Sequence, residues 1–83
     1  MANFAFSIHA LEQMENRNIS QEIVKEVLAF PDKIENEFEH QIVYQKTINF
    51  IDGNFLVRVF VNAEKEPNLV KTIYRTSKFE KYQ

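Results

Sequence analysis

The chain has 83 residues, of which 45% are hydrophobic and 27% charged, with a formal net charge of −2. This length and composition predict one globular domain over residues 1–83, with a small core. The absence of cysteine excludes disulfides, thiol nucleophiles and zinc–thiolate sites. The two histidines lie 31 positions apart, which argues against a histidine-based metal site, so no cofactor is expected.

The charge is distributed unevenly along the chain. Residues 1–45 carry eight acidic and three basic side chains, whereas residues 46–83 carry four acidic and seven basic ones. A dipolar molecule of this kind can present a basic face despite its acidic total. The sequence has no signal-peptide pattern and no apolar stretch of membrane-spanning length, so we expect a cytoplasmic protein without membrane association.

A first helix is predicted to begin after Ser7, a residue type that is favoured at the N-cap. Its apolar side is formed by Ile8, Ala10, Leu11 and Met14. Its polar side carries His9, Gln13, Asn16 and Arg17. Asn18 fits the position after the helix, because asparagine tolerates the left-handed backbone that ends helices.

A second helix is predicted between Ser20, its N-cap, and Pro31, which stops it. Ile19 and Val24 have the spacing of a hydrophobic staple across the cap. The apolar stripe of this helix consists of Ile23, Val24, Val27, Leu28 and Phe30.

From residue 33 the apolar period changes to two, which indicates strands. The predicted strands are Ile34–Phe38 at an edge, Gln41–Phe50, Phe55–Asn62 and Leu69–Thr76. Asp52-Gly53 indicates a hairpin between the second and third of them. The predicted class is α+β, with two N-terminal helices on one face of a three- to four-stranded, mainly antiparallel sheet, in the order α-α-β-β-β-β. The predicted core comprises Leu11, Met14, Val24, Val27, Leu28, Val57, Val59 and Val61.

Arg58 is the most informative polar residue, because it lies in the middle of a strand. Alternation directs Val57, Val59 and Val61 toward the helices and Arg58 toward the opposite face. The simpler interpretation is a solvated arginine with a cross-strand carboxylate. The functional interpretation is a phosphate-binding arginine on an open sheet face, since the guanidinium fork matches phosphate geometry.

Three further positions in the strands and a basic tail are compatible with RNA binding. Tyr44 and Lys46 share one face of a strand, and Tyr74 alternates with threonines on the last strand. Tyrosine also suits strands for packing reasons, so both interpretations stay open. The tail interleaves hydroxyl, basic and aromatic side chains, which suits single-stranded RNA but also suits a solvated terminus. Its candidate residues are Ser77, Lys78, Lys81 and Tyr82.

His9 lies on the polar side of the first helix, so it is not predicted to be a core histidine. A single exposed histidine on a helix usually has no function. Its position beside Arg17 and near a helix start nevertheless makes it a candidate acid–base residue.

Several segments resemble a known bacterial family. "FSIHALEQMENRNIS", "YQK" at Tyr44–Lys46, "LVRVFVN" at Leu56–Asn62 and "TIYRTSKFEKY" at Thr72–Tyr82 resemble the domain of unknown function 4258 family, in the same order along the chain. That family is similar in its layout of helices and sheet to the RelE-like and BrnT-like toxins of toxin–antitoxin systems. Two positions depart from the family pattern: Gln13 stands where arginine is usual, and Asn18 where glycine is usual.

The resemblance implies a metal-independent ribonuclease that cleaves RNA by attack of the 2′-hydroxyl, with an antitoxin protein as its partner. It implies His9 as acid or base and Arg17 and Arg58 as phosphate-binding catalytic residues. The implied RNA-binding residues are Tyr44, Lys46, Tyr74, Ser77, Lys78 and Tyr82. Because Gln13 removes a positive charge from this site, a non-catalytic module that binds protein or RNA is the alternative, and a structural protein without any site is the third.

Overall fold

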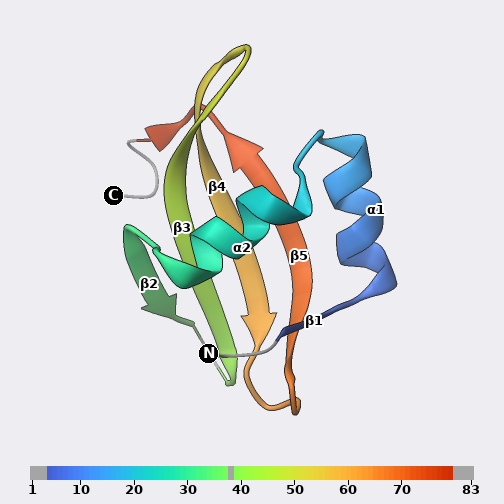
Figure 1. Ribbon diagram of the computed structural model, residues 1–83. Helices are drawn as coiled ribbons and strands as arrows, with labels where there is room; N and C mark the ends of the chain where they lie inside the picture. Colours follow the sequence, from blue (N-terminus) through green and yellow to red (C-terminus); the bar gives the residue numbers. More distant parts are fainter. Residues whose placement is uncertain (1–3, 38, 80–83) are drawn as a thin grey trace.

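The computed structural model describes residues 4–37 and 39–79. Two helices and five strands follow one another along the chain (Figure 1). Their bounds are β1 Phe4–Phe6, α1 Ile8–Asn16, α2 Gln21–Ala29, β2 Lys33–Asn36, β3 Gln41–Phe50, β4 Gly53–Asn62 and β5 Asn68–Thr76. Both helices have nine residues, and within the described ranges no helix is long and apolar enough to cross a membrane.

The strands form one mixed sheet in the order β1-β5-β4-β3-β2. The pairs β2–β3, β3–β4 and β4–β5 are antiparallel, whereas β1 pairs with β5 in parallel. The α+β class and the two helices that precede the four main strands are as predicted. The prediction of a mainly antiparallel sheet with three or four strands is corrected to a mixed sheet with five. β1 was missed because three residues show no period of their own, and only its partner β5 makes them a strand.

Local sequence signals explain where both helices begin and where the first ends. Ser7 accepts a hydrogen bond from the Ala10 amide (3.0 Å), and Ser20 accepts one from the Ile23 amide (3.3 Å). Asn18 has φ 55°, as predicted for the residue that ends α1. The Ile19 amide donates to the Met14 carbonyl (2.9 Å), which completes a Schellman-type end.

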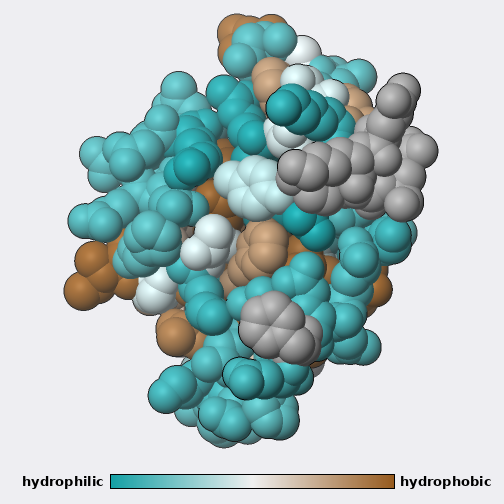
Figure 2. Space-filling view, turned by 180° about the vertical axis from the view of Figure 1, so that it is seen from behind, coloured by the Kyte–Doolittle hydropathy of each residue, from teal (hydrophilic) through white to brown (hydrophobic). Residues whose placement is uncertain are grey.

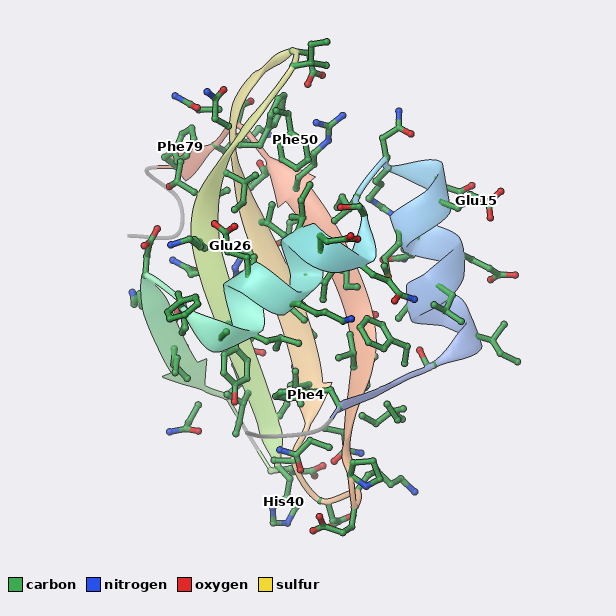
Figure 3. The ribbon with its side chains drawn as sticks, in the orientation of Figure 1. Phe4, Glu15, Glu26, His40, Phe50 and Phe79 are labelled. Atoms are coloured by element: carbon green, nitrogen blue, oxygen red, sulfur yellow. The ribbon has the colours of Figure 1, made fainter. Side chains whose placement is uncertain are left out.

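The core lies between the two helices and one face of the sheet. α2 crosses this face over β3 and β4, and α1 lies along β5 (Figure 1). The buried members are Ala10, Met14, Ile19, Val24, Val27, Val57, Val59, Val61, Val70 and Ile73. Glu15 and Glu26 are exposed on the outer sides of the helices (Figure 3). The predicted facing of the valines of β4 is therefore confirmed.

The predicted burial of Leu11 is wrong, whereas the predicted hairpin is confirmed. Leu11 is 43% exposed and Ile8 77% exposed, because α1 packs beside β5 and contributes Ala10 and Met14 to the core. The predicted hairpin joins β3 and β4. Phe50 pairs with Gly53, so its loop is formed by the two residues between them. Gly53 instead begins β4 with φ 129°, a backbone conformation that favours glycine.

Candidate functional site

A row of polar side chains crosses the sheet face that the helices leave uncovered. Gln45 on β3 pairs in register with Arg58 on β4, and Arg58 pairs with Tyr74 on β5. Residues that are directly opposite each other on neighbouring strands point to the same face. Arg58 is 6% exposed and Gln45 5% exposed, so these two polar side chains are buried in the sheet surface.

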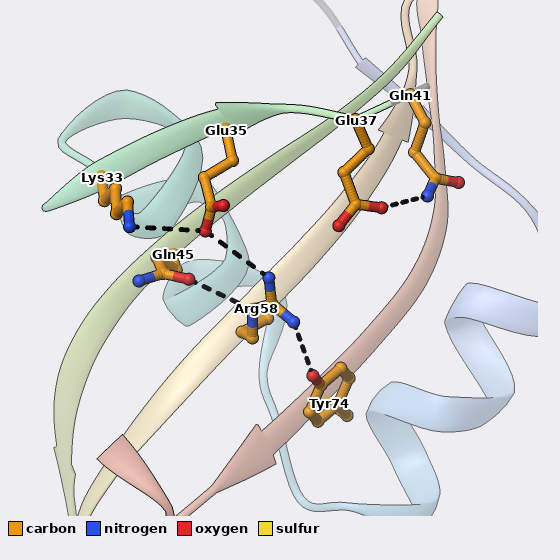
Figure 4. A network of polar contacts seen from close by, with 7 residues as sticks. All are labelled: Lys33, Glu35, Glu37, Gln41, Gln45, Arg58 and Tyr74. Carbon is orange, nitrogen blue, oxygen red and sulfur yellow. Dashed lines mark hydrogen bonds and ion pairs between the residues drawn. The ribbon is translucent and has the colours of Figure 1, made fainter. Parts of the chain in front are cut away.

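The Arg58 guanidinium has a different partner on each side (Figure 4). Its Nε donates to Gln45 Oε1 (3.1 Å), and one terminal nitrogen donates to the Tyr74 hydroxyl (2.8 Å). The other terminal nitrogen forms an ion pair with Glu35 Oε1 on β2 (3.8 Å). An arginine tolerates burial when its charge and donors are satisfied in this way. The cross-strand carboxylate of the simpler interpretation therefore exists, but the arginine is not solvated.

Aromatic rings form the apolar part of this site. Phe60 and Tyr74 stack with ring centroids 5.8 Å apart, and the Arg58 guanidinium carbon lies 5.3 Å from the Phe60 centroid and 5.9 Å from that of Tyr74. Hydrophobic residues are visible near the middle of this face in Figure 2, surrounded mostly by hydrophilic ones. The rings hold the cation by cation–π attraction and exclude water from it. We call the group formed by Glu35, Gln45, Arg58, Phe60 and Tyr74 the arginine cluster.

Sequence reasoning did not identify Glu35 and Gln45 as members of this cluster. Glu35 faces Val43 on β3 and reaches past it toward β4, while its other neighbour is Lys33 (Lys33 Nζ to Glu35 Oε1, 3.7 Å). The period of two does place Gln45 and Glu35 on the face opposite the apolar residues of their strands. The pairing register that brings them to Arg58 is not encoded in either strand by itself.

His9 lies on α1 and is bound to another residue of that helix. Its Nε2 lies 2.9 Å from the Gln13 side-chain nitrogen, while Gln13 Oε1 accepts from the Ile73 backbone amide of β5 (3.3 Å). A backbone amide can only donate, so it fixes the orientation of the Gln13 side chain. His9 Nε2 is then the acceptor, which places the proton of the neutral ring on Nδ1.

The structure brings some of the predicted site residues together and separates others. Arg58 and Tyr74 are in direct contact, whereas the hydrogen bonds of the described residues join His9 to Gln13 and not to Arg58. Arg17 is the exposed C-cap of α1. α1 flanks β5 and buries Ala10 and Met14 with the core on the other face of the sheet.

Tyr44 and Lys46 point to the helix-covered face, because they pair with Val59 and Val57. Tyr44 makes an edge contact with the Phe4 ring (6.1 Å between centroids), and Lys46 Nζ pairs with Asp32 (3.6 Å). They therefore lie across the sheet from Arg58. Ser77 and Lys78 are exposed directly after β5, and Tyr82 lies outside the described residues.

A polar cavity of about 120 Å³ lies at one end of the sheet. His40 marks this end in Figure 3, and its Nε2 lies 3.2 Å from Glu64. The cavity is lined by Glu39, His40, Gln41, Asn62, Glu64 and Lys71. In the described part of the chain, no group of three or more histidine, aspartate and glutamate side chains is arranged to hold a metal ion.

The fold and this geometry define a small α+β domain with a buried arginine cluster on its helix-free sheet face. The chain belongs to the family described as "Domain of unknown function (DUF4258)", whose model matches residues 6–75. This match confirms the family resemblance and gives no information on RelE-like toxins. No curated protein and no solved structure matches the chain.

Proposed function

We propose that this protein is a RelE-like or BrnT-like toxin-type domain that cleaves RNA without a metal ion, and that the helix-free sheet face binds the RNA. The arginine cluster is the observation that carries the proposal. In it Arg58 contacts the Tyr74 hydroxyl at 2.8 Å and pairs with the Glu35 carboxylate at 3.8 Å. A phosphate-binding cation, a proton acceptor and an aromatic ring thus lie within contact of one another.

Arg58 would bind the scissile phosphate and stabilise the charge that develops on the phosphorane. A distance of 3.8 Å is long for a charge-assisted hydrogen bond, and the Glu35 side chain is 37% exposed, so a phosphate can replace this carboxylate at the guanidinium. Gln45 would keep the guanidinium plane fixed through its bond to Nε (3.1 Å) during this exchange.

The displaced carboxylate of Glu35 would then accept the proton of the ribose 2′-hydroxyl. The 2′-oxygen forms a bond to phosphorus and the bond to the 5′-oxygen breaks, which gives a 2′,3′-cyclic phosphate and a 5′-hydroxyl. Tyr74 and Phe60 would stack against a neighbouring base. The position of Tyr44 and Lys46 on the other face gives them no part in this arrangement.

The family resemblance implies His9 as acid or base and Arg17 as a second phosphate ligand. Because Glu35 takes the role of base here, His9 would be the acid: protonated on both ring nitrogens and released from Gln13, it would give a proton to the leaving 5′-oxygen. His9 and Arg17 are both exposed on α1, beside β5. They would act on RNA only if the strand passes from the arginine cluster over the β5 side of the sheet. This requirement makes their contribution separately testable.

A non-catalytic module that binds RNA or protein is the second candidate, and two observations favour it. The first is that Arg58 is only 6% exposed, so an RNA strand has to move neighbouring side chains to reach it. The second is that His9 is held by Gln13 and not by the cluster. In this candidate the cluster stabilises the sheet and the surface around it binds the partner.

The deciding experiment incubates the purified protein with single-stranded RNA in the presence of a chelator. Wild type is compared with Arg58→Ala, Glu35→Gln and His9→Ala, and with Arg75→Ala as the matched control. Arg75 is an arginine of β5 on the opposite face, where it stacks on Phe50 and Phe55 (4.4 and 4.6 Å) and pairs with Asp52 (3.2 Å). Circular dichroism confirms that each variant is folded.

Loss of a phosphate-stabilising arginine is expected to lower the cleavage rate roughly 30- to 1000-fold, whereas Arg75→Ala retains the wild-type rate. Cleavage that is undiminished in Arg58→Ala would refute the assignment of the cluster. RNA binding by wild type without any cleavage, together with no growth arrest on expression, would establish the non-catalytic module instead.

A further inference from the structure

β2 is an edge strand of the sheet, and no strand of the described residues pairs with its outer side. The Glu37 amide donates to the Gln41 carbonyl (2.9 Å), so these two residues form a hydrogen-bonded pair with β3. Hydrogen-bonded and non-hydrogen-bonded pairs alternate along an antiparallel ladder. Ile34 and Asn36 therefore direct both their amide and their carbonyl groups away from β3.

The outer edge of β2 also carries apolar side chains that lack cover from the described residues. Ile34 is 53% exposed on the helix-covered side of the sheet, and Phe30, the C-cap of α2, is 70% exposed. Figure 1 shows this end of α2 beside β2. An exposed edge strand with large apolar neighbours is a template for pairing with another strand.

The side chains of β2 are complementary to themselves when two copies run antiparallel. A twofold axis through Ile34 places Ile34 opposite Ile34 of the second copy, and Lys33 opposite Glu35 of the second copy, twice. Lys33 and Glu35 both lie on the helix-free face, with side chains 43% and 37% exposed. The outward backbone groups of Ile34 are those that such an axis requires, because the central pair exchanges both hydrogen bonds.

We propose that this protein forms a twofold symmetric dimer in which β2 pairs antiparallel with β2 of a second copy. The isologous contact joins the two sheets edge to edge and closes both exposed edges in one step. Phe30 and Ile34 form its apolar side, and the Lys33–Glu35 pairs form its polar side. Opposite charges directly across two strands stabilise the pairing, and like charges there oppose it.

The dimer would change the surroundings of the arginine cluster, since Glu35 belongs both to the cluster and to the dimer interface. Lys33 of the second copy approaches the carboxylate that pairs with Arg58 and competes for it. Residues opposite each other across antiparallel strands share a face, so the two helix-free faces would form one continuous surface. The dimer itself does not depend on the proposed ribonuclease activity.

The interface is short, so the expected dimer is weak. The fraction of dimeric protein should rise as the concentration increases from about 1 µM to about 1 mM. Sedimentation equilibrium over this range measures it. Ile34→Lys and Lys33→Glu are expected to weaken the dimer at least about tenfold. Ile34→Lys places two lysines opposite each other at the axis, and Lys33→Glu places a glutamate opposite Glu35 of the second copy. Ile51→Lys is the matched control, since Ile51 is fully exposed at the β3–β4 turn, away from β2.

A charge-exchange experiment tests the register. Lys33→Glu and Glu35→Lys each create like-charge contacts in their own dimers, but an equimolar mixture restores opposite charges at both contacts. We expect the mixture to dimerise more tightly than either variant does separately. A wild-type protein that stays monomeric at about 1 mM would overturn the proposal, because this concentration is on the order of the dissociation constant of the weakest relevant dimer. A dimer that Ile34→Lys and Lys33→Glu leave unchanged would overturn it equally, provided that circular dichroism shows both variants folded.

Discussion

Tyr74→Phe removes a single hydroxyl and thereby one of the partners of the buried Arg58. The hydroxyl accepts a hydrogen bond from the guanidinium at 2.8 Å, while the Tyr74 ring stacks on Phe60 at 5.8 Å. The substitution keeps the ring and its stacking. Its effect therefore reports mainly the charge-assisted hydrogen bond.

Hydrogen bonds to charged groups contribute about 1.5–3 kcal/mol, and Tyr74 is half-buried, so we expect a loss of about 1.5 kcal/mol in the free energy of unfolding. For a domain of this size that corresponds to a decrease in Tm of about 6–12 °C. Urea denaturation followed by circular dichroism measures the free energy, and a thermal scan measures Tm.

Tyr44→Phe is the control, because Tyr44 is also half-buried on a central part of the sheet and its ring contact with Phe4 survives the change. Its effect should stay within about 0.5 kcal/mol. In an Arg58→Met background, Tyr74→Phe should cost much less than in wild type, since the donor is gone. Equal effects of Tyr74→Phe and Tyr44→Phe in the wild-type background would refute the role given to this hydrogen bond.

Other parts of the fold give predictions of different kinds. Val59→Asp places an unpaired charge at a fully buried position and should cost more than about 4 kcal/mol, so a Tm near that of wild type would contradict the assigned facing. Ser7→Ala should cost about 1–2 kcal/mol and more than Ser20→Ala. Ser7 caps α1 and also donates to a carbonyl of β5 (3.1 Å), whereas the Ser20 side chain caps α2 and has no such bond to the described strands. Gln13→Ala should destabilise α1 by about 1 kcal/mol. It should also release the His9 Nε2 acceptor, which 15N NMR detects as a change of tautomer; an unchanged tautomer would show that Gln13 does not set it.

Local patterns in the sequence determined the helices, their caps and the facing of the long strands. Ser7, Ser20 and Asn18 act through bonds or dihedral angles within a few residues, so their roles follow from residue type and spacing. The period of two likewise directs Val59 and Arg58 to opposite faces, because successive side chains of a strand point to opposite faces of the sheet. The placement of Arg58 on the helix-free face could therefore be predicted.

The tertiary structure decided which residues meet across elements. β1 is a strand only because the edge of β5 accepts it in parallel, and Leu11 is exposed because α1 docks through its smaller neighbours. Glu35 reaches Arg58 through a register across three strands, and His9 is held by a glutamine that a β5 amide orients. Each of these facts depends on how separate segments are positioned against one another. No periodicity within a segment contains that information, which is why the sequence identified the arginine and the fold supplied its partners.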